Sequence, residues 1–284
     1  MTGTADAART AQARTGTSLT WSLLTQERGT AEVPAAWGGE VTPEWAWGGS
    51  TGRGVRVCVV DSGVEAEHPM IGPVDGSWVV APVNGSIRVT ETAPVDVCGH
   101  GSACAGIIRS LAPECEIHSV RVLGESFGGT GDVFVAGLRW AVEQGFDVIN
   151  LSLSTSRPKF TAPLREVADD AFFRRSVIVA SAHNMRVESF PWRFSSVISV
   201  GSHDVDDPDL VLYNPSPPVE FFAQGQNVEV AWLGGARTRN TGNSFATPRI
   251  SGLCALILAK HPRVTAFQLK NILYLTAANV RGES

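Results

Sequence analysis

The chain has 284 residues, 43% of them hydrophobic, and a net charge of −5 at neutral pH. This is the composition of an ordinary globular protein. A chain of this length can bury roughly 75% of the surface that it exposes when unfolded. The acidic balance argues against nucleic acid and anionic membranes as partners, and no apolar run approaches the ~20 residues of a membrane span.

The N-terminal residues 1 to about 20 are rich in Ala, Thr and Gly and are predicted to be disordered. No apolar segment follows their arginines, so we expect no secretory signal peptide. The five cysteines are scattered and show neither metal-binding spacing nor a disulfide framework. Free thiols persist in a reducing compartment, which predicts a cytoplasmic protein.

From about residue 50 onward, short β-branched strands alternate with helix-like segments. The strands are expected at 55–60, 116–123, 147–153, 176–181 and 196–201, and the helices at 100–111, 131–145, 162–174, 244–260 and 265–278. This alternation predicts an α/β fold of three layers, with a mostly parallel twisted sheet and helices on both faces. Because no linker interrupts it, we expect a single domain over 21–284 that includes an N-terminal extension.

Two short motifs come at places where such a fold carries functional residues, beyond the carboxyl ends of strands. Asp61 opens DSG (61–63) directly after the strand 55–60, although Asp-Ser-Gly alone is also a common turn. His100 lies in GHGSACAG (99–106), where small residues would let the helix that it opens pack closely. Taken alone, a histidine in such a place is more often a structural residue than a catalytic one.

A third motif, TGNSFATPRISG (241–252), places Ser244 at the start of the helix 244–260. Free N–H groups and the positive end of the dipole at a helix N-terminus suit a developing oxyanion. A serine there could instead be only an N-cap. Pro248 inside the helix sacrifices a hydrogen bond, which makes the motif harder to dismiss.

Taken together, the three motifs occur in the Asp, His, Ser order of subtilisin. The chain resembles the subtilisin-like serine proteases, or subtilases, over about 45–280, where the motifs stand as DSG, HGSACAG and GNSFATP. The segments 120–154 and 176–184, the second ending in Asn184, follow the family pattern in order and spacing. Only about 50 residues precede the first predicted strand, too few for the signal peptide and prodomain of secreted subtilisins. In this respect the chain resembles a compact, intracellular type of subtilase.

The resemblance implies a role for each motif residue. Ser244 would be the nucleophile, His100 the general base, and Asp61 the group that orients and stabilises the imidazole. Asn184 would stabilise the oxyanion together with the backbone N–H of Ser244.

The same resemblance implies a peptide or protein substrate that is bound as an added strand. Its two edges would be Phe127, Gly128 and Gly129 on one side and Ser152, Leu153 and Ser154 on the other. His183 stands where the family usually has Gly and would either wall the substrate pocket or turn away from it. Asn243 before the nucleophile and Ser154 on the substrate edge also depart from the family pattern, as do Ser102 and Ala103 after His100. Together these departures favour a narrow specificity.

We expect no metal and no cofactor. The connection 107–123 is shorter than the one that carries the calcium loop in secreted subtilisins. The acidic stretch 204–210 offers oxygen ligands for a hard cation, but is read as a solvated surface loop.

The predicted function is a serine endopeptidase that works through an acyl-enzyme, with narrow specificity such as maturation of a precursor peptide. One alternative is a transpeptidase or macrocyclase, in which an amine resolves the same acyl-enzyme. Another is a non-catalytic peptide-binding relative, against which the complete residue set argues. A cysteine nucleophile, Cys98 or Cys104 beside His100, is the chemical rival.

Overall fold

The structure is a computed structural model, and it describes residues 39–126 and 128–280. The disordered segment predicted for residues 1–20 and the proposed substrate contact at Phe127 lie outside these ranges. The chain from Val41 onward groups into one compact unit. The extent 21–284 of the catalytic domain stays a prediction.

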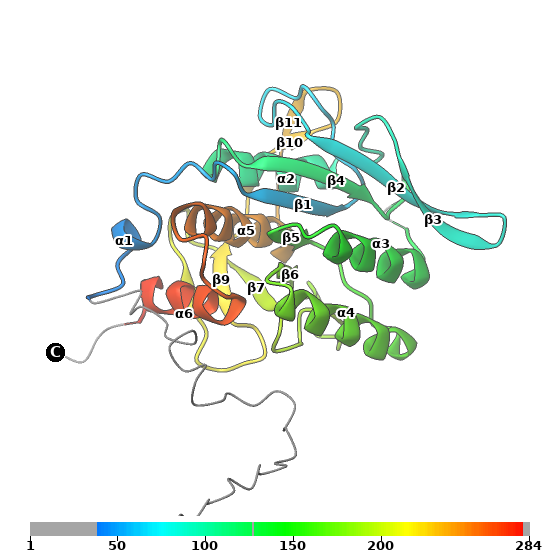
Figure 1. Ribbon diagram of the computed structural model, residues 1–284. Helices are drawn as coiled ribbons and strands as arrows, with labels where there is room; N and C mark the ends of the chain where they lie inside the picture. Colours follow the sequence, from blue (N-terminus) through cyan, green and yellow to red (C-terminus); the bar gives the residue numbers. More distant parts are fainter. Residues whose placement is uncertain (1–38, 127, 281–284) are drawn as a thin grey trace, which may run out of the picture. The chain divides into compact units, whose positions relative to one another are not determined.

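The described residues contain a nine-stranded sheet with the order β3-β2-β4-β1-β5-β6-β7-β9-β8 (Figure 1). Its strands are β1 (Arg56–Asp61), β2 (Gly76–Val83), β3 (Ser86–Glu91), β4 (Glu116–Arg121), β5 (Val148–Leu151), β6 (Val177–Ser181), β7 (Ile198–His203), β8 (Leu212–Tyr213) and β9 (Phe221–Gln224). Seven neighbouring strands pair in parallel, and only the two edge pairs, β2–β3 and β8–β9, are antiparallel. The predicted mostly parallel sheet is confirmed.

Helices cover both faces of this sheet, as predicted (Figure 1). They are α1 (Pro43–Trp47), α2 (His100–Leu111), α3 (Gly131–Glu143), α4 (Thr161–Phe173), α5 (Asn243–Lys260) and α6 (Ala266–Thr276), with a 3₁₀ turn η2 (Pro158–Phe160). The pair α2 and α5 packs on one face, and the pair α3 and α4 on the other. A separate hairpin of β10 (Val228–Trp232) and β11 (Ala236–Asn240) packs on α2. The three-layer α/β fold is confirmed.

The strand β1 shows why the sheet is buried on both faces. Its residues from Val57 to Asp61 are all buried, because helices lie above and below it. Cys58 and Val60 point into the core shared with α3 and α4. Since side chains alternate along a strand, Val57 and Val59 face the α2 and α5 side.

Small residues bring α2 close to its neighbours, as its glycine-rich start predicted. A Cβ at Gly101 would lie 1.9 Å from the carbonyl oxygen of Gly63 in the loop after β1. At the other end, a Cβ at Gly252 of α5 would lie 2.9 Å from Cβ of Leu111 in α2. Alanine at either place would force the two segments apart, so glycine holds the start of α2 against the end of β1.

None of the described helices combines the length and the apolar character that a bilayer span requires.

Candidate active site

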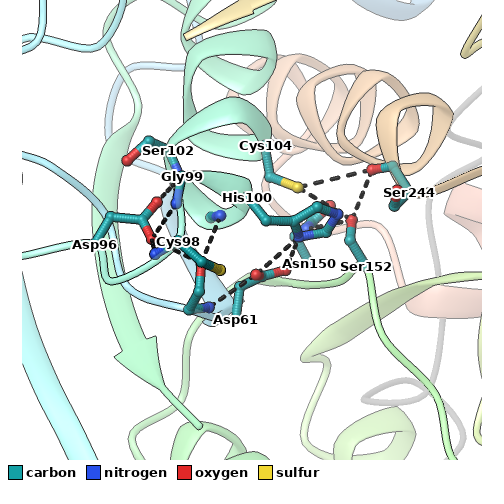
Figure 2. Close-up of polar contacts among 12 residues, drawn as sticks. Asp61, Asp96, Cys98, Gly99, His100, Ser102, Cys104, Asn150, Ser152 and Ser244 are labelled. Atoms are coloured by element: carbon teal, nitrogen blue, oxygen red, sulfur yellow. Dashed lines mark hydrogen bonds and ion pairs between the residues drawn. The ribbon is translucent and has the colours of Figure 1, made fainter. Parts of the chain in front are cut away.

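The first pair of functional side chains forms where β1 ends and α2 begins. Asp61 is the last residue of β1 and is fully buried, and His100 is the first residue of α2. Nδ1 of His100 lies 2.8 Å from Oδ1 and 2.9 Å from Oδ2 of Asp61 (Figure 2). This bond directs the opposite ring nitrogen, Nε2, away from the carboxylate.

The surroundings of His100 favour its protonated form. Burial by itself lowers the pKa of the imidazole, but the charge and hydrogen bond of Asp61 and the charge of Asp96 outweigh burial. The pKa of His100 is therefore raised above its ordinary value. A raised pKa makes this side chain a stronger acceptor for a hydroxyl proton.

Ser244 lies in the first turn of α5 and lines the same cleft as His100. Figure 2 shows the imidazole of His100 between Asp61 and Ser244. The hydroxyl of Ser152 donates to the carbonyl oxygen of Ser244 at 2.9 Å, and Asn150 donates to Ser152 at 3.2 Å. These contacts fix the backbone of Ser244 to the segment that follows β5.

Asn184 and Ser244 converge on the space beside Gly242. The backbone N–H of Asn243 donates to Oδ1 of Asn184 at 3.0 Å, which leaves the Nδ2 amino group of Asn184 as a donor. A Cβ on Gly242 would lie 3.2 Å from Oγ of Ser244 and 3.5 Å from Nδ2 of Asn184. An oxyanion formed at Ser244 would find this amino group and the helix N-terminus nearby.

Asn243, which departs from the family pattern, ties three segments together. Its Oδ1 accepts from the backbone N–H of Ser202, near the end of β7, at 2.9 Å. Its Nδ2 donates to the carbonyl oxygens of Ala182 and His183 at 3.2 and 3.3 Å. The amide therefore anchors the segment of Asn184 to the start of α5.

Asp96 is a residue of this site that the sequence reasoning missed. Its carboxylate is buried, and Oδ1 accepts from the Ser62 hydroxyl at 2.8 Å and from the N–H groups of Cys98 and Gly99 at 3.0 and 2.8 Å. Oδ2 accepts from the N–H of Ser102 at 2.8 Å (Figure 2). The carboxylate thus caps the start of α2 and joins it to the loop after Asp61.

We expect Asp96→Asn to lower the free energy of unfolding by about 3 kcal/mol. The amide NH₂ group would replace one carboxylate oxygen, so that at least one of the present donors would face an N–H donor in place of an acceptor. Denaturant unfolding measures the loss. The matched control is Asp204→Asn at an exposed carboxyl, which should change stability by less than ~0.5 kcal/mol. Equal effects of the two substitutions would contradict the capping role.

The proposed substrate residues line a cleft of about 370 Å³ that also contains His100, Asn184 and Ser244. From the expected edges, the cleft is lined by Gly129, Ser152, Leu153 and Ser154, whereas Gly128 lies next to it and contributes no lining. The segments 128–129 and 152–154 lie outside every strand pairing of the described residues. The carbonyl oxygen of Gly128 already accepts from the N–H of Gly124 at 2.9 Å, so an added strand would have to pair with the other backbone groups of these segments.

His183 lines this cleft and also a neighbouring cavity of about 340 Å³. The N–H of Met185 donates to its Nδ1 at 3.0 Å, so the ring proton is on Nε2. His183 therefore borders both spaces, and the role of its ring as a wall of the substrate pocket stays a prediction.

The five cysteines are free and buried. Burial raises the pKa of the Cys98 thiol and raises that of Cys104 well above its ordinary value. Cys104 donates through Sγ to Ser152 Oγ at 3.3 Å. A buried thiol held in its neutral form is a poor nucleophile, which argues against the cysteine alternative.

Asp61, His100 and Cys104 are the one group in the described ranges whose side chains could together hold a metal ion, with ligand atoms within 4.8 Å of one another. In the acidic stretch 204–210, two of the four carboxylates accept hydrogen bonds from the protein: Asp206 from Gln224 at 2.8 Å, and Asp207 from the N–H of Asp209 at 2.9 Å. We expect a chelator to change Tm by less than ~2 °C in a thermal melt, because only a bound ion adds stability. A larger drop would reveal a structural cation.

The site can now be compared with known proteins. The model of the subtilase family matches residues 52–284. Subtilisin DY of Bacillus licheniformis is 31% identical over 247 residues, which cover 82% of this chain and 86% of that protein. Subtilisin Savinase of Lederbergia lenta is 31% identical over 243 residues, with the same coverage of 82% and 86%. The crystal structure of a cold adapted subtilisin-like serine proteinase aligns with a TM-score of 0.64 and 26% identity, over 78% of this chain and 82% of that one.

Proposed function

Because this chain belongs to the subtilase family and is a serine peptidase, we propose that it cuts peptide bonds at Ser244 through an acyl-enzyme. One observation carries the assignment of the site. The buried carboxylate of Asp61 holds Nδ1 of His100 at 2.8 Å in the cleft that Ser244 lines. Asp61, His100 and Ser244, which are 39 and 144 positions apart in the chain, thus come together beyond the carboxyl end of β1, an interior strand of the sheet.

In the first step, Nε2 of His100 accepts the hydroxyl proton of Ser244 while Oγ attacks the carbonyl carbon of the substrate. Asp61 stabilises the imidazolium that forms. The negative oxygen of the tetrahedral intermediate accepts from Nδ2 of Asn184 and from the backbone N–H of Ser244. His100 then donates its proton to the amine, the C–N bond breaks, and the acyl group stays on Ser244.

In the second step, water attacks the acyl-enzyme and gives its proton to Nε2 of His100. The ester bond to Oγ breaks, and the proton returns to Ser244. An amine in place of water would give a new peptide bond by the same route. Transpeptidation therefore remains the alternative outcome of one mechanism.

We propose that the peptide binds as an added strand between the segments 128–129 and 152–154, and that the side-chain pocket gives narrow specificity. His183 occupies part of the cleft wall, and the hydroxyl of Ser154 donates to that of Ser189 at 3.1 Å. A substrate pocket that is lined by polar groups and narrowed by His183 would accept few kinds of substrate side chain. Maturation of a precursor peptide fits such a peptidase better than general digestion.

We place this reaction in the cytoplasm. The support is the thiol chemistry, since all five cysteines are free and buried thiols of this kind persist in a reducing compartment.

The test is mass spectrometry of products from a diverse peptide library digested in H₂¹⁸O. Hydrolysis at few sites, with one ¹⁸O in each new C-terminus and no products from Ser244→Ala, is the expected result. Products that lack ¹⁸O and join two peptides would establish transpeptidation. An uncut library, with peptides bound but intact, would support a non-catalytic relative and overturn the proposal.

A further inference from the structure

The described lining of the active-site cleft contains one positively charged side chain, that of Arg157, and no acidic one. Among the described residues that line it, Arg157 is the only Lys or Arg, and none is Asp or Glu. The chain as a whole has 28 acidic and 23 basic residues, so this bias runs against its composition. A peptide in the cleft therefore meets a local positive charge on an otherwise acidic protein.

The guanidinium of Arg157 has no ion-pair partner within the described ranges, unlike its neighbours. Nζ of Lys159, two residues further on, lies 3.7 Å from Oδ2 of Asp132. Nη1 of Arg193 lies 2.6 Å from Oε1 of Glu188. Arg157 is exposed and is one of the residues that line the cleft. It is free to pair with a group that the substrate brings.

The backbone around Arg157 is fixed on both sides. Thr155 pairs with Phe190 by two backbone hydrogen bonds of 3.0 and 2.9 Å, and the N–H of Arg157 donates to Oγ1 of Thr155 at 3.3 Å. The 3₁₀ turn η2 begins at the next residue, Pro158. Only the side chain of Arg157 has to be ordered when it binds a partner, which limits the entropy cost.

Arg157 also belongs to the same segment as the proposed substrate edge. Ser152, at the start of this segment, donates to the carbonyl of Ser244, and Arg157 follows five residues later. His183, another residue of the cleft lining, accepts from the N–H of Met185 at Nδ1, so its ring proton on Nε2 is a further N–H donor. The described lining thus offers N–H donors from both of these side chains and contains no carboxylate.

We infer that Arg157 makes this peptidase selective for substrates with an Asp or Glu side chain in the part of the peptide that pairs with Ser152–Ser154. The inference rests on the proposed function, since it takes the peptide cut at Ser244 as the occupant. A guanidinium binds a carboxylate through two parallel hydrogen bonds, whereas Gln or Asn offers no charge. A hydrogen bond to a charged group corresponds to a preference of about tenfold or more.

The experiment uses the peptide that the library identifies as the best substrate, with Glu, Gln and Lys placed in turn at each position before the cut. For the wild-type protein, we expect kcat/KM to favour Glu over Gln by about tenfold or more at one position. Arg157→Gln should reduce this ratio to about one, and Arg157→Glu should prefer Lys over Glu at the same position.

The matched control is Arg186→Glu, which changes the net charge equally. Arg186 is exposed and lines the neighbouring cavity but not the cleft. It should keep the preference for Glu. A wild-type protein that cuts the library without preferring Glu, or an equal loss in Arg186→Glu, would overturn the role of Arg157 and leave the peptidase assignment intact. A protein that cuts no peptide would overturn both.

Discussion

Replacing Ser244 by Ala is expected to lower kcat/KM for peptide cleavage by about 10⁶-fold, the size of the loss when the nucleophile of subtilisin is removed. Without Oγ no acyl-enzyme forms, and only the oxyanion donors and binding still act on water. Initial rates on the best library peptide measure the effect. Residual activity within tenfold of the wild type would contradict the assignment.

Two controls accompany this variant. Thermal melting should show Ser244→Ala as stable as the wild type, because the hydroxyl is part of the open cleft. Cys104→Ala should retain most activity, since its thiol only donates to Ser152 and to the carbonyl of Ser244. Loss of activity in folded Cys104→Ala, with Ser244→Ala active, would move the nucleophile to sulfur.

Replacing Asp61 by Asn should lower kcat by about 10⁴-fold, as the corresponding change does in other triads. The same substitution should shift the pH dependence. Activity requires neutral His100, so kcat/KM of the wild type should fall as pH drops through a midpoint above the ordinary ~6.5 of histidine. Asn removes the charge that raises the pKa of His100 and leaves burial, which lowers it, so the midpoint should move to lower pH.

A pH profile of kcat/KM for both proteins, on a peptide without titrating groups in this range, measures the shift. Asp204→Asn, at an exposed carboxyl, is the control and should leave the midpoint unchanged. An unmoved midpoint in Asp61→Asn would mean that another group governs the acidic limb.

The sequence predicted the central part of the fold because the elements there are strongly patterned. The predicted helix 100–111 coincides with α2, and the strand predicted at 55–60 differs from β1 by one residue at each end. Both are apolar segments with clear limits, which a period of 3.6 or a β-branched run reveals. The helix boundaries at α5 and α6 differ by no more than two residues at either end.

The two hairpins were missed although their turns are visible in the sequence. Asn84-Gly85 is the two-residue connection of β2 and β3, with positive φ at both residues, and such an Asn-Gly pair is a strong hairpin signal. The connection of β10 and β11 has three residues, 233–235, and its two glycines also have positive φ. The flanking strand β3 is mostly exposed and so lacks the apolar run on which the prediction relied.

For the site, short motifs identified the residues whose chemistry is recognisable by itself. Asp96 escaped because its partners are backbone N–H groups and the hydroxyl of Ser62, which is 34 positions away. An acid just before a predicted helix is a capping signal, but the contact with Ser62 depends on the tertiary fold. Arg157 escaped for a similar reason, since only the cleft distinguishes an unpaired arginine from a surface one.

The central claim is that Ser244 is activated by His100 and Asp61, and covalent labelling tests it most directly. The native protein is treated with a fluorophosphonate, and the modified residue is located by peptide mapping and tandem mass spectrometry. We predict one adduct, on Ser244, with labelling that is lost in His100→Ala and slowed in Asp61→Asn. An adduct on another residue, or labelling of Ser244 at the same rate without His100, would contradict the account.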